Sequence, residues 1–587
     1  MRAFFSVVFL RFLWILQVWR GCFRGVLEDA VVLGEVSGNA VVLGRVPGNR
    51  GPERWRGALF SLRRASCGLP GLMSEMRIVL AMSGEGGAAS PVRRGTPIRR
   101  GTRFVEEREE KPDRNTALSV GLTLVMTLYA FDQLGTVSVM PAVSEELDGQ
   151  SLYGATFSAF LLASIVTLTL AGDAADRWGL GRSFLLALVL FAVGLMISAF
   201  APTMLLLVVG RGVQGFGGGA LSTITFLTVH LGYEEKQRAG MLATLSAAWV
   251  LPGLLGPPIA GYMADVFSWR WVFVGIFLLI PFVAVLTFPS LKNLGTKGGD
   301  RSPAGNRAEA RDQADQGAQA TPQPFFQDSR VWCALLAALG MGVFLFGLSR
   351  VLPVVPAVLC AGIGLSVGCR AVAGLLPPGT FLFRPVLPVC SMLRFLLAFA
   401  FFGTDAFVSL ALHEIHDVSL TTASMVYTVA AVTWALGSRL QARIDRPILL
   451  AEIGALLITV GIGILMLVPG LSASFVIAIA AWAVAGLGMG FAHNAVTLTA
   501  MSATVDGKES QTSASLGLAD ALGVGLGSGI GGAMLGAGED FGWALSSALL
   551  LVWGVMLLVG LVSWGGTVRL RRFMRKDAPV FAKDSIE

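Results

Sequence analysis

Four ionisable residues, Asp132, Arg211, Asp405 and Asp520, lie inside stretches of sequence that are otherwise strongly apolar. A charged side chain in hydrocarbon is costly, so such residues usually pair with one another or face water, and they often mark proton and substrate pathways. A buried carboxylate can bind a proton, a cationic substrate, or each in turn. These residues therefore predict a role in coupling protons to a solute. The simpler alternatives are a helix-end arginine for Arg211 and satisfied interhelical hydrogen bonds for Asp405 and Asp520.

The elements that must hold these residues are apolar segments of about 18 to 27 residues, the length that a helix needs to cross a bilayer. Six such segments fall within residues 116–290, two within 331–370 and six within 385–567. The polar stretch 291–330 is rich in Gly, Pro and Gln, which indicates a cytoplasmic linker. We expect an all-α polytopic membrane protein of about fourteen spans, although loop charges alone fit twelve equally well.

Composition supports this class and excludes others. Hydrophobic residues make up 54% of the 587 residues and charged residues only 14%, far below the share of a soluble protein. The net charge of +7 arises in residues 1–114, which hold 19 Lys and Arg against 11 Asp and Glu. A nucleic-acid partner is therefore not implied. We expect residues 1–115 to be a basic, disordered cytoplasmic tail resting on anionic lipid, or in part a mis-called start, and residues 568–587 to be a second basic tail.

The loops between the apolar segments alternate in charge. One set carries most of the lysines and arginines, Arg177, Arg182 and Arg439 among them, whereas the other collects acids such as Glu145 and Glu146. The positive-inside rule places the basic loops and both termini in the cytoplasm. The sequence therefore predicts a multi-pass protein of the cell membrane.

The loop after the second apolar segment has a distinctive spacing. Residues 172–182 form the sequence Gly-Asp-Ala-Ala-Asp-Arg-Trp-Gly-Leu-Gly-Arg, which predicts a tight, water-exposed turn between two spans. The pattern G-x3-D-R-x-G-x-x-R resembles the loop between helices 2 and 3 of the major facilitator superfamily of secondary transporters. The resemblance implies two six-helix bundles, here with two extra central helices. It also implies a cytoplasmic gating loop that latches the two bundles, formed by Gly172, Asp173, Asp176, Arg177, Gly179 and Arg182. A plain charged turn is the alternative.

Two further motifs resemble this superfamily. In the fourth segment Arg211 is followed by Gln214, Gly215 and Gly217, which matches the pattern R-x-x-Q-G-x-G, and the family uses the arginine position in proton coupling. The fifth segment is similar to the antiporter motif G-P-x-x-G-G, with Ala260 in place of the penultimate glycine. Its prolines and glycines predict a bent helix, which relatives associate with export, although a purely structural kink is the alternative. The residues that carry this motif are Pro252, Gly253, Gly256, Pro257 and Gly261.

The first segment and the start of the sixth segment each contain a further motif of this superfamily. Phe131 to Pro141 resembles the signature L-D-x-T-x-V-x-x-A-x-P of the fourteen-span drug:proton antiporters, except that Thr136 follows Asp132 by four residues instead of two. The turn Trp269-Arg270-Trp271 resembles the family's W-R-W/Y pattern, and we expect it to anchor the chain at headgroup depth.

These signals favour a transporter over an enzyme. The sequence contains no GxxxxGK[ST] loop for ATP and no HExxH or nucleophile elbow in a catalytic setting, so we expect no cofactor, metal or catalytic residue. We predict a monomeric, proton-coupled exporter of amphipathic or cationic drug-like compounds, with a small-molecule substrate, protons and the lipid bilayer as its partners. The alternatives are a proton-coupled transporter of a defined metabolite, siderophore or lipid, and a non-transporting receptor or scaffold.

Overall fold

The computed structural model describes residues 114–233, 235–297, 329–349, 352–383, 386–444, 446–470, 474–504 and 509–581. Every regular element in these ranges is a helix. Fourteen helical runs within them are long and apolar enough to cross a membrane, which confirms the expected all-α polytopic fold. The tail before residue 114, the linker residues 298–328 and the last residues of the basic C-terminal tail lie outside the described ranges.

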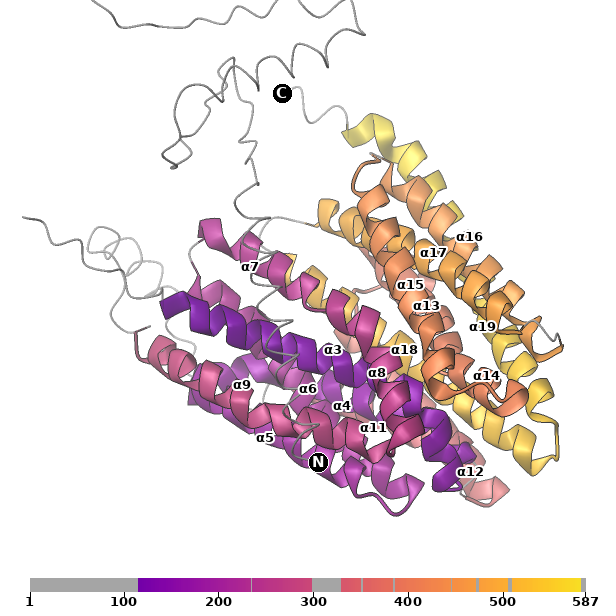
Figure 1. The fold of residues 1–587 in the computed structure, drawn as a ribbon. Coiled ribbons are helices and arrows are strands. Elements are labelled where there is room, and N and C mark those ends of the chain that lie inside the picture. Colours follow the sequence, from indigo (N-terminus) through magenta and orange to yellow (C-terminus); the bar gives the residue numbers. More distant parts are fainter. Residues whose placement is uncertain are drawn as a thin grey trace, which may run out of the picture. The chain divides into compact units, whose positions relative to one another are not determined.

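The first six spans form the N-terminal half of the bundle, drawn from indigo to magenta in Figure 1. Its helices are α3 (Arg114–Glu146), α4 (Tyr153–Trp178), α5 (Leu180–Ala199), α6 (Met204–Gly232), α7 (Glu235–Ala247), α8 (Val250–Val266) and α9 (Arg270–Lys297). Helix α6 packs closely against α4 and α5 because its glycines carry no side chain. A Cβ atom on Gly217, for example, would lie only 2.6 Å from the carbonyl oxygen of Ala187 on α5.

The last six spans form the C-terminal half, drawn from orange to yellow in Figure 1. Its helices are α13 (Leu387–Asp405), α14 (Val408–His416), α15 (Leu420–Gln441), α16 (Pro447–Leu465), α17 (Ser474–Ser502), α18 (Glu509–Asp540) and α19 (Leu545–Phe581). One span of this half is interrupted, because α13 and α14 are separated by a turn at Ala406 and Phe407. Three short 3-10 helices, Gln150–Leu152, Thr380–Leu382 and Val468–Gly470, lie in the connections.

Two helices between the halves, α11 (Ser329–Leu348) and α12 (Val354–Leu375), form the extra hairpin that the sequence predicts. They pack against each other through small residues, and Gly340 lies directly against Gly368. Helix α11 also contacts α4 of the N-terminal half and α18 of the C-terminal half. The hairpin therefore touches both halves.

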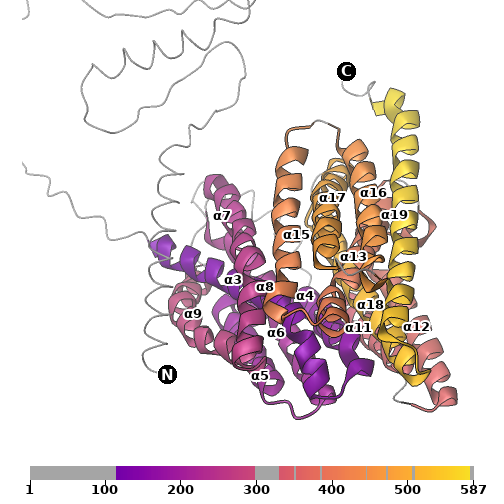
Figure 2. The ribbon, with the colours of Figure 1, turned by 45° about the vertical axis from the view of Figure 1, so that its right-hand side comes forward.

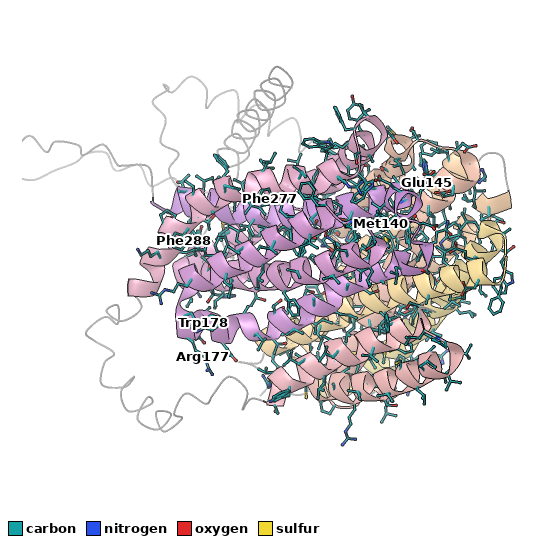
Figure 3. All side chains as sticks on the ribbon, turned by 90° about the horizontal axis from the view of Figure 1, so that it is seen from below. Met140, Glu145, Arg177, Trp178, Phe277 and Phe288 are labelled. Atoms are coloured by element: carbon teal, nitrogen blue, oxygen red, sulfur yellow. The ribbon has the colours of Figure 1, made fainter. Side chains whose placement is uncertain are left out.

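Successive spans run in opposite directions, so the described residues have two ends. We call them the Leu147 end, where the turns at 147–149, 267–269 and 417–419 lie, and the Gly179 end, where the turn at Gly179 lies. Figure 3 shows Arg177 and Trp178 at the end opposite Glu145. Helix α9 continues seven residues into the segment 291–330, so the predicted linker begins later than expected.

The expected polar turn over residues 172–182 is wrong in extent. Helix α4 continues through Trp178 and α5 begins at Leu180, so that Gly179 alone joins them, with a φ of 82° that favours glycine. Asp176, Arg177 and Trp178 are exposed on the last turn of α4. Polar residues can therefore stay helical here, because that turn projects beyond the packed core.

Two antiparallel helix pairs join the halves. Helix α4 packs on α18, where Ser158 Oγ donates a hydrogen bond to the Gly525 carbonyl at 2.6 Å. Helix α8 packs on α15, and Figure 2 shows these two helices side by side. A Cβ atom on Gly261 would lie 2.6 Å from the Leu420 carbonyl oxygen, so glycine is what permits this approach. We refer to these contacts as the α4–α18 seam and the α8–α15 seam.

Candidate transport site

A fully buried ion pair lies inside the N-terminal half. Asp132 on α3 is 0% exposed and Arg211 on α6 is 1% exposed. Arg211 Nη1 donates to Asp132 Oδ2 at 2.9 Å, and Gln214 Nε2 donates to Asp132 Oδ1 at 2.7 Å. The arginine and glutamine of the R-x-x-Q-G-x-G pattern thus bind the carboxylate of the first span. The alternative of a helix-end arginine for Arg211 is therefore wrong.

The surroundings of this pair hold both charges in place. Gln133 Nε2 gives Asp132 Oδ2 a further hydrogen bond at 3.2 Å. The Arg211 guanidinium lies 4.5 Å from the centre of the Phe160 ring, a cation–π contact. Tyr129 stands between Phe160 and Trp249, with ring centroids 6.0 Å and 5.7 Å away. A buried ion pair needs additional hydrogen bonds to offset desolvation, and Gln133 and Gln214 supply such bonds to Asp132.

The C-terminal half holds a second cluster that is more accessible. Arg394 Nε on α13 donates to Asp520 Oδ1 on α18 at 2.8 Å, and its Nη2 pairs with Asp520 Oδ2. His493 Nε2 on α17 lies 3.4 Å from Asp520 Oδ2, and Arg394 Nη1 donates to Thr497 Oγ1 at 2.6 Å. The Asp520 side chain is 24% exposed, in contrast to Asp132. Each half therefore contributes one arginine–aspartate pair.

Arg394 is a candidate site residue that lies outside every motif described above. Its signal is nevertheless present in the sequence, since Arg394 interrupts the apolar run from Leu387 to Phe402. An arginine inside a spanning segment is a functional candidate by its cost alone. No motif of the resembled family covers this position, which explains the omission.

Asp405 has different neighbours from the other two carboxylates. Trp482 Nε1 on α17 donates to Asp405 Oδ1 at 2.6 Å. The Tyr427 hydroxyl on α15 donates to the Asp405 backbone carbonyl at 3.1 Å. Among the described residues no cation lies within ion-pair distance of Asp405. The structure therefore brings Asp132 together with Arg211, and Asp520 together with Arg394, but leaves Asp405 with neutral partners.

One group of side chains at the Leu147 end has the composition of a metal site. Ligand atoms of Glu145, His413 and Glu414 lie within 4.8 Å of one another. Both glutamates belong to helix ends, and His413 Nδ1 bonds the Val418 carbonyl at 2.9 Å. The two histidines at this end are thus partly buried and bonded, since His416 Nε2 also lies 2.9 Å from the Val468 carbonyl.

Comparison with known proteins places this architecture in a family. The profile of the Major Facilitator Superfamily matches residues 122–389, from the first span into the interrupted one. A probable multidrug-efflux transporter of Mycobacterium tuberculosis is 25% identical over 479 residues, which are 79% of this chain and 97% of the relative. The family profile and the multidrug-efflux relatives together support a transporter of the major facilitator superfamily.

Further relatives agree with this assignment. A multidrug transporter of Bacillus subtilis is 30% identical over 179 residues, which are 30% of this chain and 33% of its own. Among solved structures, a bacterial homolog of the human lysosomal transporter Spinster, inward-facing and unoccupied, has a TM-score of 0.55 at 16% identity. That alignment covers 80% of this chain and 98% of the other, and it shows a common fold.

The antiporter motif of the fifth span lies on the α8–α15 seam. The span is broken at Ala248 and Trp249, before all three prolines, and α8 runs through Pro257 and Pro258 without a break. The break falls where Pro252 would clash with the carbonyl four residues earlier. Pro258 likewise cannot donate to the Leu254 carbonyl, and Thr428 Oγ1 on α15 donates to it instead, at 3.0 Å.

The motif's glycines allow α8 and α15 to pack at short distance. Gly253 faces Ala431 on α15, where an added Cβ atom would lie 3.1 Å from the alanine Cβ. Gly261 faces the first turn of α15, as described above. Gly256 instead faces the Phe131 ring on α3 of its own half. The span is therefore interrupted just before this motif, and two of the motif's glycines serve contact between the halves.

An acidic residue after this motif connects the halves at the Leu147 end. Asp265 Oδ1 accepts a hydrogen bond from Leu420 N at 3.1 Å, and Oδ2 accepts from Thr421 N and Oγ1 at 2.9 Å and 2.6 Å. A carboxylate at the first N–H groups of a helix is a strong cap. We call this arrangement the Asp265 clasp.

The first tryptophan of the Trp269-Arg270-Trp271 turn is buried in the protein. Trp269 is 2% exposed, and its Nε1 donates to Glu146 Oε2 at 2.7 Å. Arg270 pairs with the same carboxylate and stacks on the Trp269 ring at 4.3 Å. The glutamate at the end of α3 thus draws the indole inward, and Trp271, at 39% exposure, is the exposed residue of the turn.

Proposed function

We propose that this protein exports amphipathic or cationic drug-like compounds across the cell membrane in exchange for protons. The observation that carries the proposal is the set of intramembrane charges in both halves, Asp132 with Arg211 and Asp520 with Arg394. A scaffold has no need of such costly groups, whereas a transporter uses them to couple solute and ion. Multidrug-efflux relatives along most of the chain support a drug-like substrate.

The mechanism is alternating access by rocking of the two halves about their shared centre. The seams and the Asp265 clasp hold the halves together at the Leu147 end in this conformation. Basic residues on the Gly179 end support a cytoplasmic location for that end and for both termini. Gly172, Asp173, Asp176, Arg177, Gly179 and Arg182 would then form the cytoplasmic contact of the opposite, outward-facing state.

Aromatic rings beside the buried charges suit a cationic aromatic compound. Trp249, at 37% exposure, stands against Tyr129 one turn from Asp132. In the other half Trp434 lies against His493 of the second cluster, with ring centroids 5.6 Å apart. Such rings bind flat cations by stacking and by cation–π attraction. We infer that a single substrate molecule binds between these two groups in a monomeric protein.

Transport by the purified chain in liposomes tests this function. Liposomes with an acidic lumen should accumulate ethidium, a permanent cation, against its gradient, and should lose it when the proton gradient is collapsed. A panel of amino acids, siderophores and lipids separates the metabolite alternative from drug export. If no compound moves in response to an acid-inside or acid-outside gradient, the proposed function is wrong.

A further inference from the structure

We propose that Asp405 is the residue on which the exchanged proton travels, and that its protonation is linked to the contact between the halves at the Leu147 end. This inference rests on the proposed proton antiport and names the proton site within it. Asp132 and Asp520 keep their arginine partners throughout the cycle.

The difference lies in the partners of the three carboxylates. Asp132 accepts from a guanidinium and two amides, and Asp520 accepts from a guanidinium beside a histidine. Losing the charge of either would leave a buried arginine unpaired, which is strongly unfavourable. Within the described part of the chain, the Asp405 carboxylate has one side-chain partner, the neutral indole N–H of Trp482, so it can gain and lose a proton without leaving a cation unpaired.

Asp405 also lies at a break in its span. Helix α13 ends at Asp405 and α14 begins at Val408. The Tyr427 hydroxyl bridges the two sides of the break, because it accepts a hydrogen bond from Ser409 N at 2.9 Å and donates one to the Asp405 carbonyl at 3.1 Å. Interrupted spans with free backbone groups are where secondary transporters build their coupling-ion sites. Trp482 and Tyr427 thus hold the carboxylate and the break from two different helices.

The same break contacts the N-terminal half. The Phe407 ring stacks on Tyr153 of α4, with centroids 5.4 Å apart and planes inclined by 28°. Ser409 Oγ points to the Ser138 carbonyl of α3 at 3.5 Å. A change at Asp405 therefore reaches the contact between the halves within two to four residues of chain.

Few other titratable groups surround this carboxylate. Tyr427 on α15 and Tyr153 on α4 are the neighbouring hydroxyls, both buried. The remaining described charged groups on α13, α14 and the helices packed against them belong to other clusters or lie toward helix ends. They are Asp132, Glu145, Glu146, Arg394, His413, Glu414, His416, Arg439, Glu452, His493, Asp520, Glu539, Asp540, Arg569, Arg571 and Arg572. None of the ionic groups in this list forms a described contact with the Asp405 side chain.

The proton balance is simple. When the halves separate at the Leu147 end, one proton from outside binds a carboxylate oxygen of Asp405 and converts it to a neutral carboxylic acid. The halves then close at that end, and the proton leaves toward the cytoplasm as substrate binds. No other bond forms or breaks, and no co-reactant is needed.

The test compares two kinds of transport by full-length variants in liposomes. Asp405→Asn should keep ethidium counterflow at equal pH but lose gradient-driven accumulation, and its counterflow should no longer depend on pH. Glu452→Gln is the control, because it alters another partly buried carboxylate of the same half. This variant should behave like wild type in both assays. If Asp405→Asn still accumulates ethidium with the wild-type pH dependence, the assignment is wrong.

A second variant serves in case Asp405→Asn does not fold. Trp482→Phe removes the indole N–H that donates to the Asp405 carboxylate. Its loss favours the neutral carboxylic acid, so the pH midpoint of exchange should rise by about one unit. An unchanged midpoint would overturn the assignment. A wild-type protein that moves no ethidium would instead contradict the proposed function itself, so the two failures are distinct.

Discussion

The Asp265 clasp offers a direct test of how the two halves close. Asp265 accepts three hydrogen bonds from the first turn of α15, and it reaches them from the end of α8 in the other half. A carboxylate cap on a helix N-terminus contributes about 0.5–2 kcal/mol, and the exposure of Asp265 favours a value near 1 kcal/mol. The contact exists only when the halves meet at this end. Asp265→Ala should therefore shift the equilibrium about fivefold toward the state that is open there.

Distance measurement between spin labels can detect this shift. Labels at Phe200 and Leu467, which are exposed on opposite halves at the Leu147 end, would report the open and closed populations by pulsed electron resonance. Glu539→Ala is the matched control, because it removes an exposed acid at the same end that takes part in no described clasp. An unchanged distribution in Asp265→Ala, or an equal shift in Glu539→Ala, would refute the reasoning.

Three further substitutions test the site and the seams. Asp132→Asn leaves Arg211 as an uncompensated buried charge, so counterflow and gradient-driven transport should both be lost. Thermal unfolding in detergent should show a destabilisation of about 3 kcal/mol or more, and normal stability would contradict this. Arg394→Lys cannot reproduce the two-point contact with its carboxylate partner, so the initial rate of ethidium transport should fall at least about tenfold. Gly261→Val should open the α8–α15 seam, because a Cβ atom there meets a backbone carbonyl of α15, and the spin-label distances should lengthen; Gly240→Ala, where a Cβ atom meets nothing within 4 Å, is the control.

The span architecture follows from local properties of the sequence. Apolar length sets the number and approximate positions of the spans, because a helix must satisfy its own backbone to cross a membrane. The position of Asp132 inside a span could be predicted for the same reason. The hairpin over 329–375 was also predictable, since its two helices are each long and apolar.

The partners of the charged residues depend on packing and could not be predicted. Asp132 and Arg211 are 79 residues apart, and Arg394 and Asp520 are 126 apart, so only the packed helices bring them together. The break at Ala406 and Phe407 has no proline or glycine within it, and it is stabilised by Tyr427 from another helix. The Asp265 clasp is likewise invisible in the sequence, because its acceptors lie in one half and its donors in the other.

The contacts between the halves are individually weak, and this suits a contact that must break in every cycle. The α4–α18 seam consists of backbone approaches and one serine hydrogen bond, and the α8–α15 seam of glycine contacts, one threonine hydrogen bond and the clasp. Hydrogen bonds of this kind contribute about 1 kcal/mol each. The strong ion pairs, in contrast, lie within single halves, where they need not separate when the halves rock. A proton on one uncompensated carboxylate beside these weak contacts can therefore decide which end is open, because the energy it must supply is only a few kcal/mol.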